Sequence, residues 1–361
     1  WTRLGYPIPH KPLVNVLDSS EMCDMLTEQR VYKIVYASEC EQGAGSEPSD
    51  TVIVNDKASV VVSIPTDIDP CWGITHIKIY RLASTWDIEK GFLAFDGDFN
   101  PGFADLGTES EYFYVGKVPV GTPEFVDDLQ ECLGHSLRTD DFYPPKQGIR
   151  IVGETNLQSL VGFEGQNLWF SERNAYWAWP NRARHNFPEE IQCVGVCQDT
   201  VIVVTRNQVY TVQDTVDCRD STCRPVQEGK DPFVYCGSGS CVSAGTGILY
   251  TTLEGLAYST IDGQTRIVSQ RAFGKNDWAL AGPSQMRLGK GCEHLFLSTD
   301  HCTYAIPLAF DESGQLPDNV STLSFTPDEW LNDEHDQLYF IIGDSAYSFN
   351  TGADYMDMRW R

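Results

Sequence analysis

Residues 160–171, LVGFEGQNLWFS, carry the pattern that decides the fold. A short apolar run leads into a tight polar turn at Glu164-Gly165, and a second apolar run follows. Two-residue hairpin turns need positive φ, which glycine, asparagine and aspartate tolerate. Both flanking runs hold the branched and aromatic residues that favour strands. The stretch therefore predicts a β-hairpin.

The same unit occurs five times along the chain. The copies are 160–171, 201–212, 248–259, 295–306 and 338–349, with turns at Glu164-Gly165, Arg206-Asn207, Glu254-Gly255, Asp300-His301 and Gly343-Asp344. Successive turns lie about 42, 48, 46 and 43 residues apart, the interval expected for one blade of a β-propeller. A lone hairpin cannot bury both of its faces, so the repeats predict packed sheets with a shared core. The alternative is a large β-sandwich whose even spacing is a coincidence.

A smaller β domain is predicted ahead of the repeats. Runs of strand-forming residues occur at 31–37, 51–54, 59–64, 74–82, 112–118 and 125–128, and a loop rich in glycine, serine and acid is expected at 41–49. Strands at this spacing with polar turns are typical of an immunoglobulin- or fibronectin-like β-sandwich.

We therefore predict an all-β chain in which β-propeller-like repeated hairpins follow an immunoglobulin- or fibronectin-like sandwich. Its parts are an extended connector over 1–29, the sandwich over 30–135, a linker over 136–159 and the blades over 160–361. The chain starts with Trp1 and ends in YMDMRWR, which resembles a strand cut short. We expect it to be a piece of a longer polypeptide, and we expect residues outside it to close the propeller.

The net charge of −25 is the strongest signal in the composition. Such a charge repels a phosphate backbone, which disfavours sequence-reading of nucleic acids. It is compatible with a conduit along which DNA slides without sticking, and equally with simple solubility. The sequence contains no apolar stretch long enough for a membrane span.

Twelve cysteines are many for a cytosolic chain of this size. Four of them form a C-x4-C-x12-C-x4-C series: Cys218, Cys223, Cys236 and Cys241. A zinc ribbon, local disulfides such as Cys218 with Cys223, and free thiols all fit this series. Cys193 and Cys197 flank an apolar Val-Gly-Val and are expected in the core.

Motifs of catalysis and metal binding are incomplete. The run Asp96 to Asn100 begins like a calcium loop, but Pro101 and Gly107 stand where that loop needs glycine and glutamate. Residues 259–265 depart from the aspartate box of sialidases, and no nucleophile elbow or zinc-protease helix is present. We expect no enzyme activity and no cofactor.

One stretch combines aromatic and basic residues in an otherwise acidic chain. It contains Trp169, Tyr176, Trp177, Trp179, Arg182 and Arg184. Rings at this density are typical of a propeller core or of packing between subunits, and a platform for sugars is the other reading. The arginines could contact DNA, an acidic partner or another subunit. We predict these six residues at a subunit contact or at a lumen.

Several motifs occur in an order that resembles a known family. They include RLGYPIP (3–9), RVYKIVYASECEQGAGSEPS (30–49), ITHIKIYRLAS (74–84), LQSLVGFEGQNLWFSERNAYWAWP (157–180) and YMDMRWR (355–361). The chain is similar, over essentially its whole length, to the tail nozzle or tail tubular proteins of short-tailed bacteriophages. It departs from that family in its cysteine excess and in the acidic insertion at 96–105.

The resemblance implies a structural protein of the virion, with no catalytic residues. It implies a ring of copies, commonly a hexamer, below the portal and adaptor, which retains packaged double-stranded DNA and guides it through the lumen during ejection. Assembly would take place in the host cytoplasm. The alternative from another class is a secreted β-propeller that is carbohydrate-active or binds a receptor.

Overall fold

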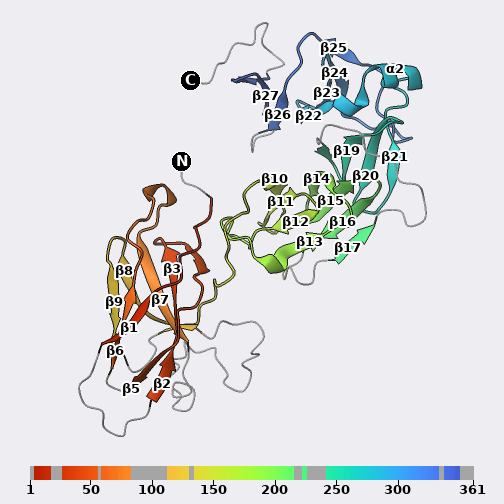
Figure 1. The fold of residues 1–361 in the computed structure, drawn as a ribbon. Coiled ribbons are helices and arrows are strands. Elements are labelled where there is room, and N and C mark those ends of the chain that lie inside the picture. The colour runs from red at the N-terminus through yellow and green to blue at the C-terminus, as the bar shows by residue number, and fades with distance from the viewer. Residues whose placement is uncertain are drawn as a thin grey trace. The chain divides into compact units, whose positions relative to one another are not determined.

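Strands dominate the computed structural model, which describes residues 4–17, 27–55, 58–82, 112–129, 134–214, 222–225, 241–332 and 337–349 (Figure 1). Its helical elements are short: α2 (Lys275–Leu280) and the 3-10 turns η1 (Pro70–Trp72), η2 (Asn181–Ala183) and η4 (Pro283–Gln285). No helix in these ranges is long and apolar enough to cross a membrane. The chain is therefore nearly all β, as the sequence predicts.

The chain divides into two compact units. The first contains residues 1–147 and 171–183, and the second contains 148–170 and 184–361. The chain consequently passes from one unit to the other three times. The segment 171–183, which we call the aromatic segment, leaves the second unit after its first hairpin and belongs by its contacts to the first unit.

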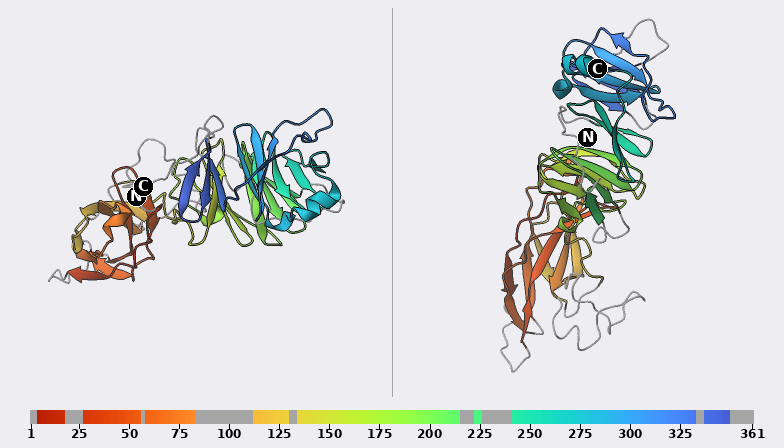
Figure 2. Two further views of the ribbon diagram at one scale, coloured as in Figure 1. Left: turned by 90° about the horizontal axis from the view of Figure 1, so that it is seen from above. Right: turned by 90° about the vertical axis from the view of Figure 1, so that its right-hand side faces the viewer.

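The second unit consists of five consecutive antiparallel sheets, here called blades 1 to 5 (Figures 1 and 2). Blade 1 contains β10 (Arg150–Glu154), β11 (Leu160–Glu164), β12 (Asn167–Phe170) and β13 (Arg184–Asn186); blade 2 contains β14 (Ile191–Cys197), β15 (Thr200–Thr205), β16 (Val209–Gln213) and β17 (Thr222–Pro225). Blade 3 contains β18 (Val242–Ala244), β19 (Gly247–Thr251), β20 (Leu256–Thr260) and β21 (Thr265–Ile267); blade 4 contains β22 (Arg287–Gly291), β23 (His294–Ser298), β24 (Thr303–Pro307) and β25 (Ser321–Leu323). Blade 5 has three strands in the described residues: β26 (Glu329–Asn332), β27 (Leu338–Ile342) and β28 (Ser345–Ser348).

The five predicted hairpins are confirmed, and each forms the second and third strands of one blade. Blades 1 and 5 use two-residue loops that begin with Gly165 and Gly343, whose φ values of 55° and 58° lie in the left-handed region. In blades 2 to 4 four residues separate the last paired positions of the second and third strands, and the predicted turn dipeptides lie in these four-residue loops. These blades make the fold propeller-like.

A threonine opens each four-residue loop. Thr205, Thr252 and Thr299 donate the backbone N–H to the carbonyl oxygen of the fourth loop residue, and the hydroxyls of Thr252 and Thr299 donate to the same oxygen. Hydroxyl side chains stabilise turns in this way. These three threonines recur every 47 residues. They are a second repeat signal in the sequence, which the turn dipeptides do not reveal.

Successive blades pack through their first strands, and glycine makes this packing possible. β10, β14, β18, β22 and β26 contact one another in chain order. A Cβ on Gly195 would lie 2.3 Å from Ile248 Cγ2 of the next blade, and one on Gly289 would lie 2.4 Å from Trp330 Cγ. Since such distances are far below van der Waals contact, each glycine accommodates a side chain of the following blade.

The first unit is a β-sandwich. One sheet has the order β4 (Gln42–Gly45), β3 (Tyr32–Ala37), β7 (His76–Leu82), β8 (Tyr112–Pro119), and the other face is formed by β1 (Val14–Leu17), β6 (Ser59–Ser63) and β9 (Glu124–Asp127) together with the pair β2 (Thr27–Arg30) and β5 (Val52–Asn55). Inward residues of both faces, such as Ile34, Ile79 and Val60, share one core. The immunoglobulin- or fibronectin-like type of this sandwich stays a prediction.

Three segments differ from the sequence analysis. Val14–Leu17, inside the predicted connector 1–29, pairs with β6. Gln42–Gly45, inside the predicted loop 41–49, is strand β4, because its glycines allow close approach: a Cβ on Gly45 would lie 2.4 Å from Asp140 Oδ1. Arg150–Glu154, inside the predicted linker 136–159, is the first strand of blade 1, which a search for hairpins alone could not find.

A buried charge cluster lies in the sandwich. The Asp127 carboxylate is fully buried, accepts a hydrogen bond from Tyr32 Oη at 2.7 Å and pairs with Arg81 Nη1 at 3.0 Å. Arg30 Nη1 lies 3.6 Å from the same oxygen. Burial and the neighbouring carboxylate raise the pKa of Tyr32, so its hydroxyl remains a donor. The cluster joins β2, β3, β7 and β9.

Gly195→Ala should destabilise the second unit by about 1–3 kcal/mol, because the added methyl group overpacks against Ile248. Gly153→Ala is the matched control: its Cβ would lie 3.3 Å from Val196 Cγ2, a tight contact that a shift of a few tenths of an ångström relieves, so this substitution should cost less. Chemical denaturation measures both. A double-mutant cycle tests the contact directly. The double variant Gly195→Ala with Ile248→Ala should lose less free energy of unfolding than the two single variants lose together. Additive losses would contradict the proposed packing.

Asp127→Ala should cost about 3–5 kcal/mol of unfolding free energy, because it leaves two buried guanidinium groups without their carboxylate. Asp50→Ala is the control. Asp50 pairs with Lys11 at 2.6 Å, but its side chain is 79% exposed, so its loss should cost about 0–1 kcal/mol. Equal costs for the two variants would show that the buried cluster does not stabilise the sandwich.

Candidate functional site

The aromatic segment (171–183) packs against the sandwich within the first unit. The Trp177 indole donates from Nε1 to the Gln42 carbonyl oxygen at 3.2 Å and contacts the sandwich core. The Trp179 backbone N–H donates to the Tyr143 carbonyl oxygen at 2.7 Å, and its indole N–H donates to the Tyr176 carbonyl oxygen at 3.0 Å. These contacts give the aromatic residues a role inside the chain.

The basic residues nearby also have partners in the chain. Arg182 forms ion pairs with Asp141 and Glu172, which fixes the end of the aromatic segment. Arg184, in the second unit, lies over the Trp169 ring with its Cζ 5.5 Å from the ring centroid. Stacking of this kind stabilises an exposed guanidinium by about 0.5–1 kcal/mol.

The structure therefore separates the six residues predicted at a subunit contact or lumen. Trp169 and Trp179 are only 2% exposed, so their rings belong to the core and offer no surface to a neighbouring subunit. Tyr176, Trp177 and Arg182 are partly exposed, and Arg184 is exposed. For these four residues the subunit contact stays a prediction.

A cavity of about 340 Å³ lies along the first strands of the blades. It is lined by residues of blades 1, 2, 4 and 5, such as Arg150, Val194, Arg287 and Trp330, and by Cys241 just before the first strand of blade 3. Two arginines and two acidic residues, Asp328 and Glu329, give the wall both signs of charge. An acidic lumen in a ring of copies stays a prediction.

Blade 5 presents a partly exposed apolar face. In blades 1 to 4 the residue at the second position of the hairpin repeat is at most 1% exposed, at Val161, Ile202, Leu249 and Phe296. On β27, Leu338 and Phe340 point toward blade 4, so Tyr339 and Ile341 point to the opposite face, where both are only half-buried. Leu331 on the neighbouring β26 is 43% exposed. In a propeller this face packs against a further blade.

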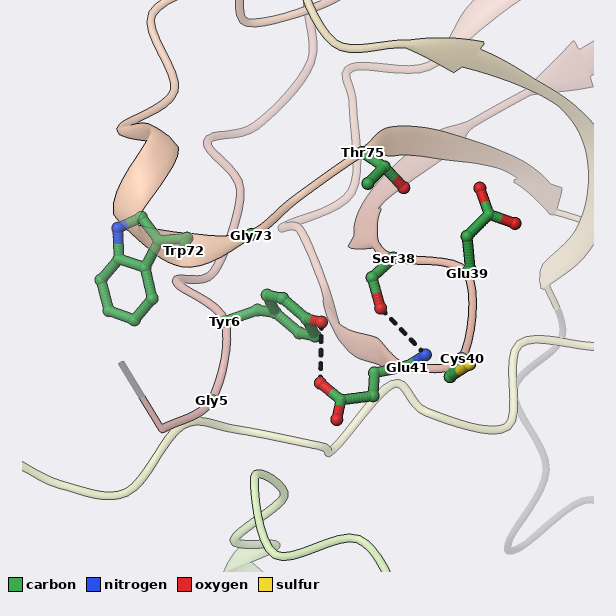
Figure 3. A pocket seen from close by; sticks show the side chains of 9 residues that line it. All are labelled: Gly5, Tyr6, Ser38, Glu39, Cys40, Glu41, Trp72, Gly73 and Thr75. Atoms are coloured by element: carbon green, nitrogen blue, oxygen red, sulfur yellow. Dashed lines mark hydrogen bonds between the residues drawn. The ribbon is translucent and has the colours of Figure 1, made fainter. Parts of the chain in front are cut away.

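A second cavity, of about 330 Å³, lies in the sandwich unit (Figure 3). The Tyr6 hydroxyl donates to Glu41 Oε2 at 2.8 Å, and the Glu41 backbone N–H donates to Ser38 Oγ at 3.2 Å. Burial raises the pKa of Tyr6 to about 12, so its hydroxyl stays protonated at neutral pH. The pair holds the N-terminal segment against the loop at 38–41, as Figure 3 shows. Trp72 lines the same cavity.

Acidic residues at the start of two blades bind the hairpin loops of those blades. Glu189 accepts hydrogen bonds from Asn207 Nδ2 at 2.8 Å, the Asn207 backbone N–H at 3.0 Å and Thr205 Oγ1 at 3.0 Å. These bonds, chiefly those from Asn207, lower the pKa of Glu189. In blade 5, Asp328 Oδ2 accepts from the Gly343 N–H at 2.7 Å. In the sequence nothing distinguishes Glu189 from the many other acidic residues of the chain.

The structure describes some of the twelve cysteines. Cys193 and Cys197 are 1% and 4% exposed, which confirms the expectation that they belong to the core. Cys218 and Cys236 of the zinc-ribbon-like series, and the calcium-like loop at 96–107, lie outside the described residues. Within those that are described, no three His, Cys, Asp or Glu side chains are grouped so as to hold a metal.

Comparisons with known proteins do not assign a family. No family model matches the chain, and no curated protein matches it. Among solved structures the chain is similar to a catalytically inactive virginiamycin B lyase from Staphylococcus aureus (TM-score 0.37, 13% identity, 57% of this chain and 72% of that one). It is also similar to a functionally unknown protein from Desulfotomaculum acetoxidans (TM-score 0.41, 11% identity, 91% and 94%). Similarities this distant carry no argument about activity.

Glu189→Gln should flatten the acid side of the stability profile. Because the pKa of Glu189 is lowered in the folded state, its contribution is present above the unfolded value of about 4.5 and is lost as pH falls through the folded value. Thermal melts across the acid range should therefore show a smaller loss of midpoint for Glu189→Gln than for the wild type. The exposed neighbour serves as control: Glu190→Gln should keep the wild-type profile. Identical profiles for all three proteins would contradict a role for Glu189 in the loop.

Proposed function

We propose that this chain is a structural component of a bacteriophage virion tail, in the nozzle or tube ring below the portal and adaptor. Its role would be to retain packaged DNA and to guide it during ejection. The ordered motifs from 3–9 to 157–180 support this proposal through their resemblance to tail nozzle proteins. The β-sandwich and the propeller-like blades are the two parts that the resemblance implies.

The observation that carries the proposal is the partly exposed apolar face of blade 5. Among the described residues blade-to-blade packing occurs four times, and each time the equivalent face of one blade is covered by the next. On blade 5 this face presents Leu331 and Ile341. A neighbouring copy that supplies the next β-sheet would continue an interface that the chain already uses. Head-to-tail contacts of this type close into rings when the rotation permits.

The net charge of the chain supports the proposal that DNA passes through the ring without binding tightly. A chain with a net charge of −25 contributes a repulsive field to any ring it forms. A duplex that passes through such a ring would make few tight phosphate contacts and could slide. The partner would therefore be double-stranded DNA that is confined but not read.

Leu331→Asp and Ile341→Asp should abolish higher assembly while the monomer remains folded, because each places an unpaired charge in a buried interface. Leu280→Asp is the control, since Leu280 is 85% exposed at the end of α2. Native mass spectrometry and light scattering measure the oligomer, and circular dichroism checks the fold. A wild-type protein that remains monomeric at high concentration, alone and with portal and adaptor proteins, would overturn the proposal.

A further inference from the structure

The first strands of blades 2 and 3 lie side by side in matched register. Ser243 Oγ donates to the Val196 carbonyl oxygen at 3.0 Å, and Cys241 Sγ donates to the Val194 carbonyl oxygen at 3.1 Å. The donors, Cys241 and Ser243, are two residues apart. Their acceptors, Val194 and Val196, are also two residues apart and follow in the same order along the chain. β14 and the segment that leads into β18 therefore run parallel, with side chains of blade 3 contacting the backbone of blade 2.

This register places two thiols opposite each other. A Cβ on Gly195 would lie 3.3 Å from Ser243 Oγ, so these two residues face each other across the blades. Two residues back on both strands are Cys193 and Cys241. Both pack in one apolar cluster. The pair thus spans the boundary between two blades.

We propose that Cys193 and Cys241 form a disulfide that links blades 2 and 3 when the protein meets an oxidising environment. The inference rests on the contacts between these blades and does not depend on the proposed virion function. Because the two cysteines are 48 positions apart in sequence, the bond would close a long loop. Bonds that close long loops restrict the unfolded chain most.

The two thiols differ in access, and this difference orders the reaction. Cys241 is half-buried and lines the cavity along the first strands, whereas Cys193 is 1% exposed. Burial and the neighbouring Cys241 thiol raise the pKa of Cys193, which makes it the poorer first nucleophile. Cys241 is therefore the thiol that a small oxidant meets first.

With glutathione disulfide as oxidant the exchange balances in two steps. The Cys241 thiolate attacks one sulfur of glutathione disulfide, which forms a mixed disulfide and releases one glutathione thiolate. Cys193 then loses its proton and attacks the Cys241 sulfur, which releases the second glutathione. The two cysteines are oxidised by two electrons in total, and one glutathione disulfide is reduced to two thiols.

A third thiol nearby provides the control. Cys197 lies on β14 as Cys193 does and is also buried, but its Sγ donates to the Gly247 carbonyl oxygen at 3.3 Å. In the register of these strands it is matched with Gly245 and not with Cys241. Cys197→Ala should therefore leave the bond intact, while Cys241→Ser removes one partner and keeps a donor to the Val194 carbonyl oxygen.

The test is to equilibrate the reduced full chain in glutathione redox buffers, alkylate it under denaturing conditions and map the peptides by mass spectrometry. We expect a peptide pair joined through Cys193 and Cys241, about 2 Da lighter than the two reduced peptides, in wild type and Cys197→Ala and not in Cys241→Ser. The thermal midpoint of the oxidised wild type should exceed that of the reduced protein by several degrees. This difference should be smaller in Cys241→Ser.

Two results would overturn the inference. One is alkylation of both Cys193 and Cys241 at every redox ratio. The other is a Cys241 that carries glutathione while Cys193 remains alkylated, since this would show that the two sulfurs cannot meet. Circular dichroism of each reduced variant excludes loss of fold as the cause of a missing bond.

Discussion

Close approach of neighbouring blades along their first strands is the constraint on which the second unit depends. There is no room for a Cβ where the next blade inserts a side chain, so glycine occupies those positions: Gly195 beneath Ile248, Gly289 beneath Trp330 and Gly291 beneath Leu338. Each blade therefore completes the core of the one before it. A blade on its own would leave the corresponding apolar face in water, and for blade 5 this face is still partly exposed.

The hairpins were predictable because their signals are local. Alternating apolar runs, the glycines at 165 and 343 and the regular spacing all lie within short stretches of sequence. The first strand of each blade was not predictable in the same way. Arg150–Glu154 is half exposed and carries few strand-forming residues, and its assignment depends on pairing with β11. Gln42–Gly45 was expected as a loop because the close packing that favours its glycines involves Asp140 and Tyr6, far away in sequence.

The candidate site was harder to predict for the same reason. Trp169 and Trp179 stand out in sequence as a possible contact surface, yet tertiary packing buries both. Glu189 appeared to be one acid among many, but three hydrogen bonds to the loop of blade 2 distinguish it. Sequence can indicate that aromatic or acidic residues are concentrated in a stretch. It does not say which of them are used inside the chain and which are left for a partner.

The proposed assembly rests on two features of the architecture. One is the sandwich, whose strands are joined by a buried charge cluster. The other is the series of blades, in which the last described blade has a partly exposed apolar face. The most direct test of this account is a cryo-electron microscopy map of the assembled particle at side-chain resolution. The account predicts density from another protein sheet packed on Leu331 and Ile341 in every copy. A map in which these side chains face solvent in every copy would contradict it.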